Sequence, residues 1–275
     1  MITLEIQNLS LGYNHREVVQ SLSFQLKAGE MLGLIGPNGC GKTTIIKALS
    51  RVLSPRTGRI LLNGKDLAAI SRSELARLIG VVPQNPYLPE NFTVAEIVLL
   101  GRNPYLGLLR NESARDISIV WWAMERTGIS HLAGRKMGEL SGGEKQRVTI
   151  ARVLAQEPGA ILLDEPTANL DINHQIAILD LISGLCREKN LAVLIVMHDL
   201  NMAAQYCGRL LLMDHGRLRA EGTPDEVITR SNIKEVYGTD SYIYQHPVNR
   251  LPVVILNTCG SNGHKSHENS GVLPC

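Results

Sequence analysis

The chain has 275 residues, of which 44% are hydrophobic and 20% are charged, and its formal net charge is +2 at pH 7. This composition is typical of a folded globular protein and excludes wholesale disorder. Aromatic residues make up only 4%, so the chain lacks both the positive charge and the stacking side chains of a nucleic-acid-binding protein. We therefore expect no nucleic-acid partner.

The sequence predicts neither a membrane span nor a signal peptide. Its longest uninterrupted apolar run, residues 191–197, is far shorter than the roughly 18–20 residues that cross a bilayer. The N-terminal residues lack the basic and apolar regions of a secretory signal. The odd number of cysteines favours free thiols in a reducing cytoplasm: Cys40, Cys186, Cys207, Cys259 and Cys275.

The first third of the chain predicts an alternation of strands and helices. Short apolar runs at residues 31–35 and 80–82 are expected of parallel strands that are covered on both faces. Ser71 with Glu74 is a capping-box pattern at a helix start. In chain order, we expect strands and turns over residues 2–35, a helix over 44–53, a hairpin strand over 58–63, a helix from Ser71, and a strand over 80–82.

Helical spacing dominates from about residue 85 to residue 157, which we interpret as a helical insertion in an α/β core. Thr93 with Glu96 predicts the cap of its first helix. After it we expect a strand over 160–163, a helix over about 174–189, a strand over 191–197, a hairpin strand over 210–213 and a helix from Thr223. Residues 1–256 are then expected to form one domain.

The last residues, 257–275, are rich in Gly, Ser and Asn and predict a mobile tail. Four of them suit a soft metal ion by residue type: Cys259, His264, His267 and Cys275. Their spacing matches no zinc pattern. A solvated tail is the simpler interpretation, and metal or redox regulation is the alternative.

The residues after the strand at 31–35 match the phosphate-binding pattern GxxxxGK[ST]. The sequence GPNGCGKTT at residues 36–44 lies between a predicted buried strand and a predicted helix. Backbone N–H groups can turn around phosphates there, and the helix N-terminus adds positive potential. Lys42 can reach the β- and γ-phosphates, and the Thr43 hydroxyl can bind Mg²⁺. The candidate nucleotide contacts are Gly36, Asn38, Gly39, Gly41, Lys42, Thr43 and Thr44.

Two acidic residues follow the apolar strand at 160–163. Ligands of open α/β sheets bind at the carboxyl ends of parallel strands. At that position Asp164 can hold Mg²⁺, and Glu165 can polarise a water molecule for in-line attack on the γ-phosphate. Together with the phosphate loop, the pair predicts a nucleotide site that hydrolyses ATP.

The segment LSGGEKQ at residues 140–146 resembles the signature of ATP-binding cassette (ABC) proteins, with Glu144 in place of the first glutamine. Other residues resemble the family's remaining motifs, and they appear in the family's order. Tyr13 resembles its adenine-stacking aromatic residue, Gln84 its Q-loop glutamine, Asp171 its D-loop and His198 its switch histidine. The resemblance covers about residues 2–238. It implies an α/β P-loop NTPase fold with a RecA-like core, an N-terminal antiparallel β subdomain and a helical insertion that bears the signature.

The resemblance also assigns roles to these residues. It implies that Gln84 joins Thr43 and Asp164 around Mg²⁺, and that Gln84, Glu165 and His198 carry the catalysis. Ser141 with Glu144 is a capping box, so a helix N-terminus, which favours anions, begins at Ser141. In the family two copies form a head-to-tail dimer around two ATP molecules. The residues that would close on the partner's ATP are Ser141, Gly142, Gly143 and Asp171.

A lone cassette fits two classes of protein: the ATPase subunit of a transporter whose permease is a separate chain, or a soluble cassette ATPase of DNA repair, translation or cluster assembly. Residues 85–96 and 100–105 resemble the ATPases of type II importers for ferric siderophores, haem and cobalamin. That resemblance implies polytopic permease subunits, an extracytoplasmic substrate-binding protein, and a place on the cytoplasmic face of the inner or plasma membrane. An importer of another cargo is a further alternative.

Overall fold

The fold is built around a six-stranded sheet in a computed structural model that describes residues 2–106 and 112–257. The strand order is β10-β9-β3-β8-β7-β6. Strands β9, β3, β8, β7 and β6 run parallel, and β10 pairs antiparallel to β9. Their bounds are β3 Met31–Ile35, β6 Ile79–Val82, β7 Ala160–Asp164, β8 Ala192–Val196, β9 Arg209–Asp214 and β10 Arg217–Gly222.

Strands β3, β7 and β8 are buried at every residue, as their continuous apolar sequences predict. Because side chains alternate between the two faces of a strand, each strand contributes to two hydrophobic cores. In β3, Leu32 and Leu34 belong to one core, whereas Met31 and Ile35 belong to the other. The predicted α/β core is therefore present.

A four-stranded antiparallel sheet, β2-β1-β4-β5, and helix α1 (Lys42–Leu49) enclose the first core. The strands of this sheet are β1 Thr3–Tyr13, β2 Arg16–Lys27, β4 Thr57–Leu62 and β5 Lys65–Asp66. Helix α1 begins two residues before the predicted start at Thr44 and ends at Leu49 rather than at Leu53. It stops early because Arg51 has a φ of 56°, in the left-handed region that does not continue an α-helix.

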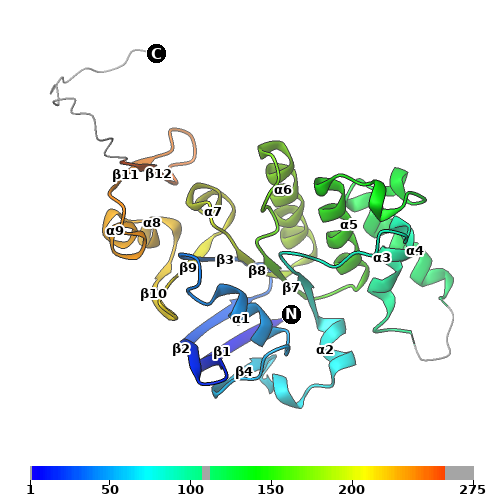
Figure 1. Ribbon diagram of the computed structural model, residues 1–275, viewed down its shortest axis with the longest axis horizontal. Coiled ribbons are helices and arrows are strands. Elements are labelled where there is room, and N and C mark those ends of the chain that lie inside the picture. The colour runs from blue at the N-terminus through cyan, green and yellow to red at the C-terminus, as the bar shows by residue number, and fades with distance from the viewer. Residues whose placement is uncertain (1, 107–111, 258–275) are drawn as a thin grey trace, which may run out of the picture.

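Helices α3, α4 and α5 lie together at the β6 end of the central sheet (Figure 1). They follow β6 and precede β7 in the chain, and Thr93 and Ser141 begin α3 and α5 with the predicted capping boxes. No helix of the described residues is long and apolar enough to cross a membrane. The helices besides α1 are α2 Arg72–Leu78, α3 Val94–Leu99, α4 Ala114–Arg126, α5 Gly142–Ala155, α6 Ile172–Lys189, α7 Leu200–Tyr206, α8 Pro224–Val227 and α9 Arg230–Tyr237.

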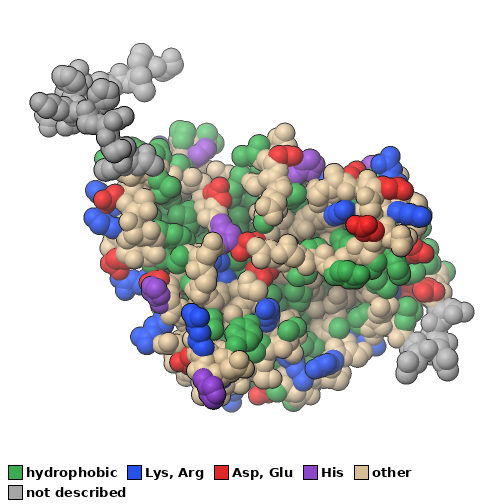
Figure 2. All heavy atoms as spheres, viewed as in Figure 1, with side chains coloured by type: hydrophobic (Ala, Val, Ile, Leu, Met, Phe, Trp, Pro, Cys, Tyr) green, Lys and Arg blue, Asp and Glu red, His purple; other side chains and the backbone are tan. Residues whose placement is uncertain are grey.

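A C-terminal hairpin lies at the opposite end of the molecule from α3–α5 (Figure 1). Strands β11 (Ser241–Gln245) and β12 (Pro252–Leu256) pair with each other in a separate sheet. The sequence analysis missed this hairpin, although both segments are rich in aromatic and β-branched residues and flank a turn that contains Pro247. Hydrophobic side chains are exposed over it (Figure 2), including Tyr242, Tyr244 and Ile255.

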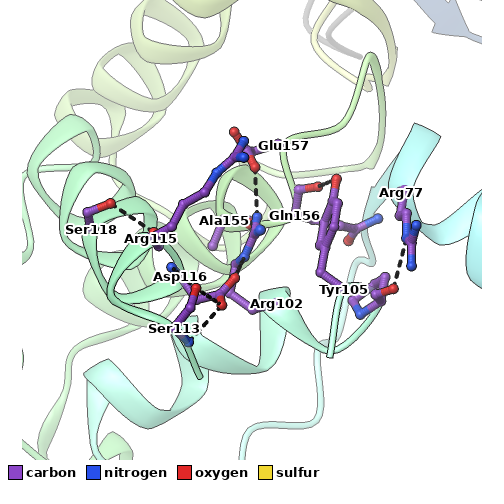
Figure 3. A network of polar contacts seen from close by, with 11 residues as sticks. Arg77, Arg102, Tyr105, Ser113, Arg115, Asp116, Ser118, Ala155, Gln156 and Glu157 are labelled. Atoms are coloured by element: carbon purple, nitrogen blue, oxygen red, sulfur yellow. Dashed lines mark hydrogen bonds and ion pairs between the residues drawn. The ribbon is translucent and has the colours of Figure 1, made fainter. Parts of the chain in front are cut away.

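A buried arginine, Arg102, connects helices α4 and α5 through polar contacts (Figure 3). Arg102 is 3% exposed, and its Nε lies 2.8 Å from Asp116 Oδ1. Its Nη1 donates to the Ala155 carbonyl at 2.7 Å and to Glu157 at 2.9 Å. The guanidinium also lies over the Tyr105 ring, 4.1 Å from the centroid. One side chain thus joins the start of α4 to the end of α5.

The Asp116→Asn substitution should destabilise the fold by about 1–3 kcal/mol at pH 7, since it removes one of the two carboxylates that pair with the buried guanidinium and leaves only Glu157. Hydrogen bonds from Ser113 and Arg102 lower the pKa of Asp116 from 3.8 to about 2. A depressed folded-state pKa means that this stabilisation is complete above about pH 4 and is lost as the pH falls towards 2. Urea unfolding at pH 7 and at pH 3 measures both effects.

Glu188→Gln is the matched control for this prediction, because Glu188 pairs with Arg126 in an exposed ion pair. Exposed pairs contribute little, so this control should change the unfolding free energy by less than about 1 kcal/mol. Equal losses in the two variants would contradict the importance of the buried pair. The Asp116→Asn variant should also lose less stability than the wild type between pH 7 and pH 3.

Candidate nucleotide-binding and catalytic site

The phosphate-binding motif forms a loop between β3 and α1. Gly36 has a φ of 146°, and a Cβ atom there would lie 2.3 Å from the Met213 carbonyl oxygen. Gly41 has a φ of 108° and directly precedes α1, a backbone conformation that glycine adopts without strain. The backbone amides of this loop and of the first turn of α1 are the donors that a phosphate requires.

Lys42 lies beneath this loop and is only 5% exposed. Its Nζ donates to the carbonyl oxygens of Gly36 at 2.7 Å and Pro37 at 2.9 Å. Within the described residues its ammonium group forms no ion pair with a carboxylate. Its third partner is the Cys40 sulfur at 3.9 Å, and a buried cation held by such neutral groups is suited to an anionic ligand.

Thr43 and Asp164 bring two oxygen ligands together. The Thr43 hydroxyl donates to Asp164 Oδ1 at 3.2 Å, across the gap between α1 and β7. Asp164 is 3% exposed, and this burial raises the pKa of its carboxyl group above the usual 3.8. Hydroxyl and carboxylate oxygens are the ligands that Mg²⁺ prefers, so this pair fits that ion. No cluster of three or more His, Cys, Asp or Glu suited to a metal occurs in residues 2–106 and 112–257.

Three neighbouring strands bring the predicted catalytic residues together. Gln84 follows β6, Glu165 follows β7 and His198 follows β8, and these strands are adjacent and parallel. Gln84 Nε2 donates to Glu165 Oε2 at 2.6 Å, while His198 Nε2 lies 2.5 Å from Glu165 Oε1. The carboxylate is therefore held at both oxygens. Gln84, the third predicted magnesium ligand, directs its amide nitrogen to Glu165 in this structure.

Glu165 has a strained backbone at the end of β7. Its φ is 50°, a left-handed conformation that is uncommon for residues other than glycine. Such strain is found at functional sites, where the surrounding structure holds the residue in place. The side chain is 14% exposed, compared with 42% for His198. The carboxylate is thus shielded but still reaches the phosphate-loop cavity.

The phosphate loop borders an open cavity of ≈ 510 Å³. Tyr13 lies at its rim, 43% exposed, with Lys47 Nζ 5.6 Å from the ring centroid. An exposed aromatic face in this position can stack on a planar base. Arg16 and Val18 also line the cavity, and the sequence analysis did not identify them because β2 carries no nucleotide motif. The full lining is Tyr13, Arg16, Val18, Asn38, Gly39, Gly41, Lys42, Thr43, Thr44 and Glu165.

The signature residues do not line this cavity. Ser141 caps α5: its hydroxyl accepts from the Glu144 N–H at 3.3 Å, and its own N–H donates to the Glu144 carboxylate at 2.8 Å. The Ser141 hydroxyl also donates to this carboxylate at 2.8 Å, and the hydrogen bonds from the Ser141 N–H and hydroxyl lower the pKa of Glu144. Gly142 and Gly143 open the first turn of α5. The exposed helix N-terminus at Ser141 therefore lies outside the phosphate-loop cavity.

Asp171 caps α6 and is linked to the signature through a residue that the sequence analysis did not select. Asp171 Oδ1 accepts from the His174 N–H at 2.9 Å, and its Oδ2 lies 2.7 Å from His174 Nδ1. These hydrogen bonds lower the pKa of Asp171. The His174 ring packs on Gly143, where an added Cβ would lie 2.6 Å from the ring. His174 thus connects Asp171 to the signature glycine.

Comparison with known proteins gives the family. Residues 19–168 match the family model described as ABC transporter. The chain belongs to the ABC transporter family. This cassette is 41% identical over 249 residues to the ferric enterobactin transport ATP-binding protein of Escherichia coli (strain K12). The matched residues cover 90% of this chain and 92% of that protein. It is 42% identical over 263 residues to the hemin import ATP-binding protein of Bordetella avium (strain 197N), covering 93% and 99% of the two chains.

Solved structures agree with this assignment. An inward-facing structure described as a metal-chelate type ABC transporter gives a TM-score of 0.82 at 27% identity, covering 94% of this cassette and 99% of that chain. The ADP-bound ATP-binding cassette MJ1267 gives a TM-score of 0.77 at 28% identity, with 86% and 98% covered. The predicted fold, an α/β ABC ATPase with an antiparallel β sheet, is confirmed. The predicted activity class, an ATPase of a transport system, is also confirmed.

Proposed function

We propose that this cassette hydrolyses ATP at Glu165 to power an importer of iron chelates or haem. The proposal rests on the contacts of the Glu165 carboxylate, which binds Gln84 through one oxygen and His198 through the other. A carboxylate fixed at both oxygens beside a phosphate-binding loop is suited to take a proton from an attacking water molecule. His198 and Gln84 orient the base and the water.

The phosphate loop supplies the electrostatic part of the reaction. Lys42 would exchange its two carbonyl partners for β- and γ-phosphate oxygens, and the loop amides would stabilise the charge that develops there. Tyr13 would stack on the adenine. Bound by Thr43, Asp164 and Gln84, Mg²⁺ would neutralise phosphate charge.

Two copies of the chain are required for two complete sites. The exposed N-terminus of α5 at Ser141 and Gly142 lies outside the phosphate-loop cavity of its own chain, which supports a head-to-tail dimer around two ATP molecules. His174 would lie at the same interface because its ring packs on Gly143, and Asp171 would lie there because it pairs with His174. ATP would then stabilise the closed dimer through contacts that ADP cannot make.

The names of the relatives support import of ferric siderophores or haem as the transport function. The cassette would bind a separate polytopic permease at the cytoplasmic face of the membrane, and the permease would connect it to an extracytoplasmic substrate-binding protein. A cavity of ≈ 800 Å³ between α2, β6 and α5 supports a place for a permease segment. Leu100, Gly101 and Pro104, from the chain segment that resembles type II importers, line this cavity.

Tagged purification from detergent-solubilised native membranes, followed by mass spectrometry, should recover a polytopic permease in amounts comparable to the cassette. The Leu100→Glu variant should lose the permease but keep its ATPase activity, because Leu100 is exposed at this cavity and does not line the phosphate-loop cavity. Ile117→Glu is the control, since Ile117 is equally exposed but does not line the cavity. Recovery only in the soluble fraction, with repair, ribosomal or assembly proteins, would favour a soluble cassette ATPase instead.

A further inference from the structure

A single asparagine side chain fastens the C-terminal hairpin to helix α7. Asn201 Nδ2 donates to the Val254 carbonyl at 3.3 Å, and the Val254 N–H donates to Asn201 Oδ1 at 2.7 Å. The side-chain amide therefore pairs with the backbone of β12 as a neighbouring strand would. The buried Val254 side chain joins the core that contains Ala203 and Ala204 of α7.

This contact supports both the hairpin and α7. A two-stranded hairpin is marginally stable by itself, and β11–β12 pairs with neither of the other sheets but packs against α7 through β12 and against α9 through β11. Helix α7 has only seven residues, fewer than an isolated helix needs in water. Its placement therefore depends on what it packs against: β12 and β3, together with the Tyr206 hydroxyl bond to Asp180 at 2.9 Å.

Helix α7 begins immediately beside the catalytic residues. His198 is followed by Asp199, which caps the helix by accepting the Met202 N–H at 2.9 Å. Asn201 is the second residue of the helix, three positions after His198. Since the His198 side chain is 42% exposed, little packing holds the ring itself. His198 thus lies between the end of β8, where the Met197 N–H donates to the Leu34 carbonyl at 3.2 Å, and the start of α7.

We infer that the β11–β12 hairpin, acting through Asn201, braces α7 so that His198 stays aligned with Glu165. Asn201 is then a positioning residue for ATP hydrolysis, and residues 241–256 belong functionally to the catalytic site. The inference rests on the proposed roles of Glu165 and His198. The inference does not extend to ATP binding, because Tyr13 and the phosphate loop belong to other elements than α7 and the hairpin.

In the full-length chain, Asn201→Ala should lower kcat about tenfold and leave KM for ATP within about twofold, because a displaced histidine misaligns the base but not the nucleotide. Asn201→Asp keeps the acceptor for the Val254 N–H and loses the donor to the Val254 carbonyl. Its kcat should therefore lie between those of the wild type and Asn201→Ala. If Asn201→Ala does not fold, the kcat of Asn201→Asp is compared with that of the wild type instead.

The matched control is Asn232→Ala. Asn232 Nδ2 donates to the Val227 carbonyl at 2.8 Å, so this variant loses a similar hydrogen bond in the C-terminal part without touching α7. Its kcat should stay within about twofold of wild type, at a comparable loss of Tm. An unchanged kcat in both Asn201 variants, a parallel rise in KM, or an equal kcat loss in Asn232→Ala would overturn the inference. Wild-type hydrolysis rates in Glu165→Gln would instead overturn the proposed function.

Discussion

The Glu165→Gln variant should bind ATP but hydrolyse it at least about a hundredfold more slowly, because the amide cannot accept the proton of the attacking water. The substitution keeps the size of the side chain, so the hydrogen bonds to Gln84 and His198 can be partly retained. With ATP bound and not hydrolysed, the dimer should accumulate in its closed form. Steady-state ATPase assays and size-exclusion chromatography with ATP measure the two effects.

Glu188→Gln provides the matched control for this experiment. It makes the same chemical change at an exposed residue whose partner, Arg126, lies outside the site. Its ATPase rate should equal that of the wild type, and it should not accumulate as a dimer. Hydrolysis at the normal rate by Glu165→Gln would remove Glu165 as the general base.

Ser141→Arg should leave ATP binding by the single chain intact while lowering hydrolysis about a hundredfold, because a bulky cation would block the helix N-terminus that we propose closes on the partner's ATP. The phosphate-loop cavity contains no signature residue, so the nucleotide affinity of one copy should not depend on Ser141. Fluorescent-nucleotide binding by the monomer, ATPase activity and ATP-induced dimerisation together measure this separation.

Two controls distinguish a blocked interface from the loss of a helix cap. Ser141→Ala removes only the capping hydroxyl and should cost about 1 kcal/mol of stability. Ser71→Arg places the same cation at the N-cap of α2, outside the signature, and should keep most of the ATPase activity. If Ser141→Arg lost nucleotide binding as a monomer, the signature would act within its own chain and the dimer proposal would be wrong.

Most of the site could be predicted from sequence because its residues lie at the ends of strands. Each of three site residues lies within two residues of the end of a strand or the start of a helix: Lys42, Asp164 and His198. The carboxyl ends of parallel strands meet at one edge of a sheet, so such residues come together. What the sequence could not give was the pairing between them. The contacts of Glu165 with Gln84 and His198 span 81 and 33 positions, so only the folded sheet brings them together.

Residues without a local motif were missed for the same reason. His174 appears in the sequence as a polar residue near a helix start, and its contact with Gly143 exists only because α5 and α6 pack together. Arg16 lines the cavity from a strand of the antiparallel sheet. The cysteine- and histidine-containing tail, residues 258–275, lies outside the described residues, so its mobility and its possible metal role remain predictions.

The sequence by itself determined the chemistry of this protein: a phosphate loop, two carboxylates and a signature, whose residue types and local spacing carry their function in short segments. Continuous apolar runs also determined which strands are buried on both faces, since the composition of a short segment is a local property. Only the tertiary structure decided the order of the strands, the two-sided hold on Glu165 and the docking of β12 on Asn201. These depend on contacts between residues far apart in the chain, which no local pattern records.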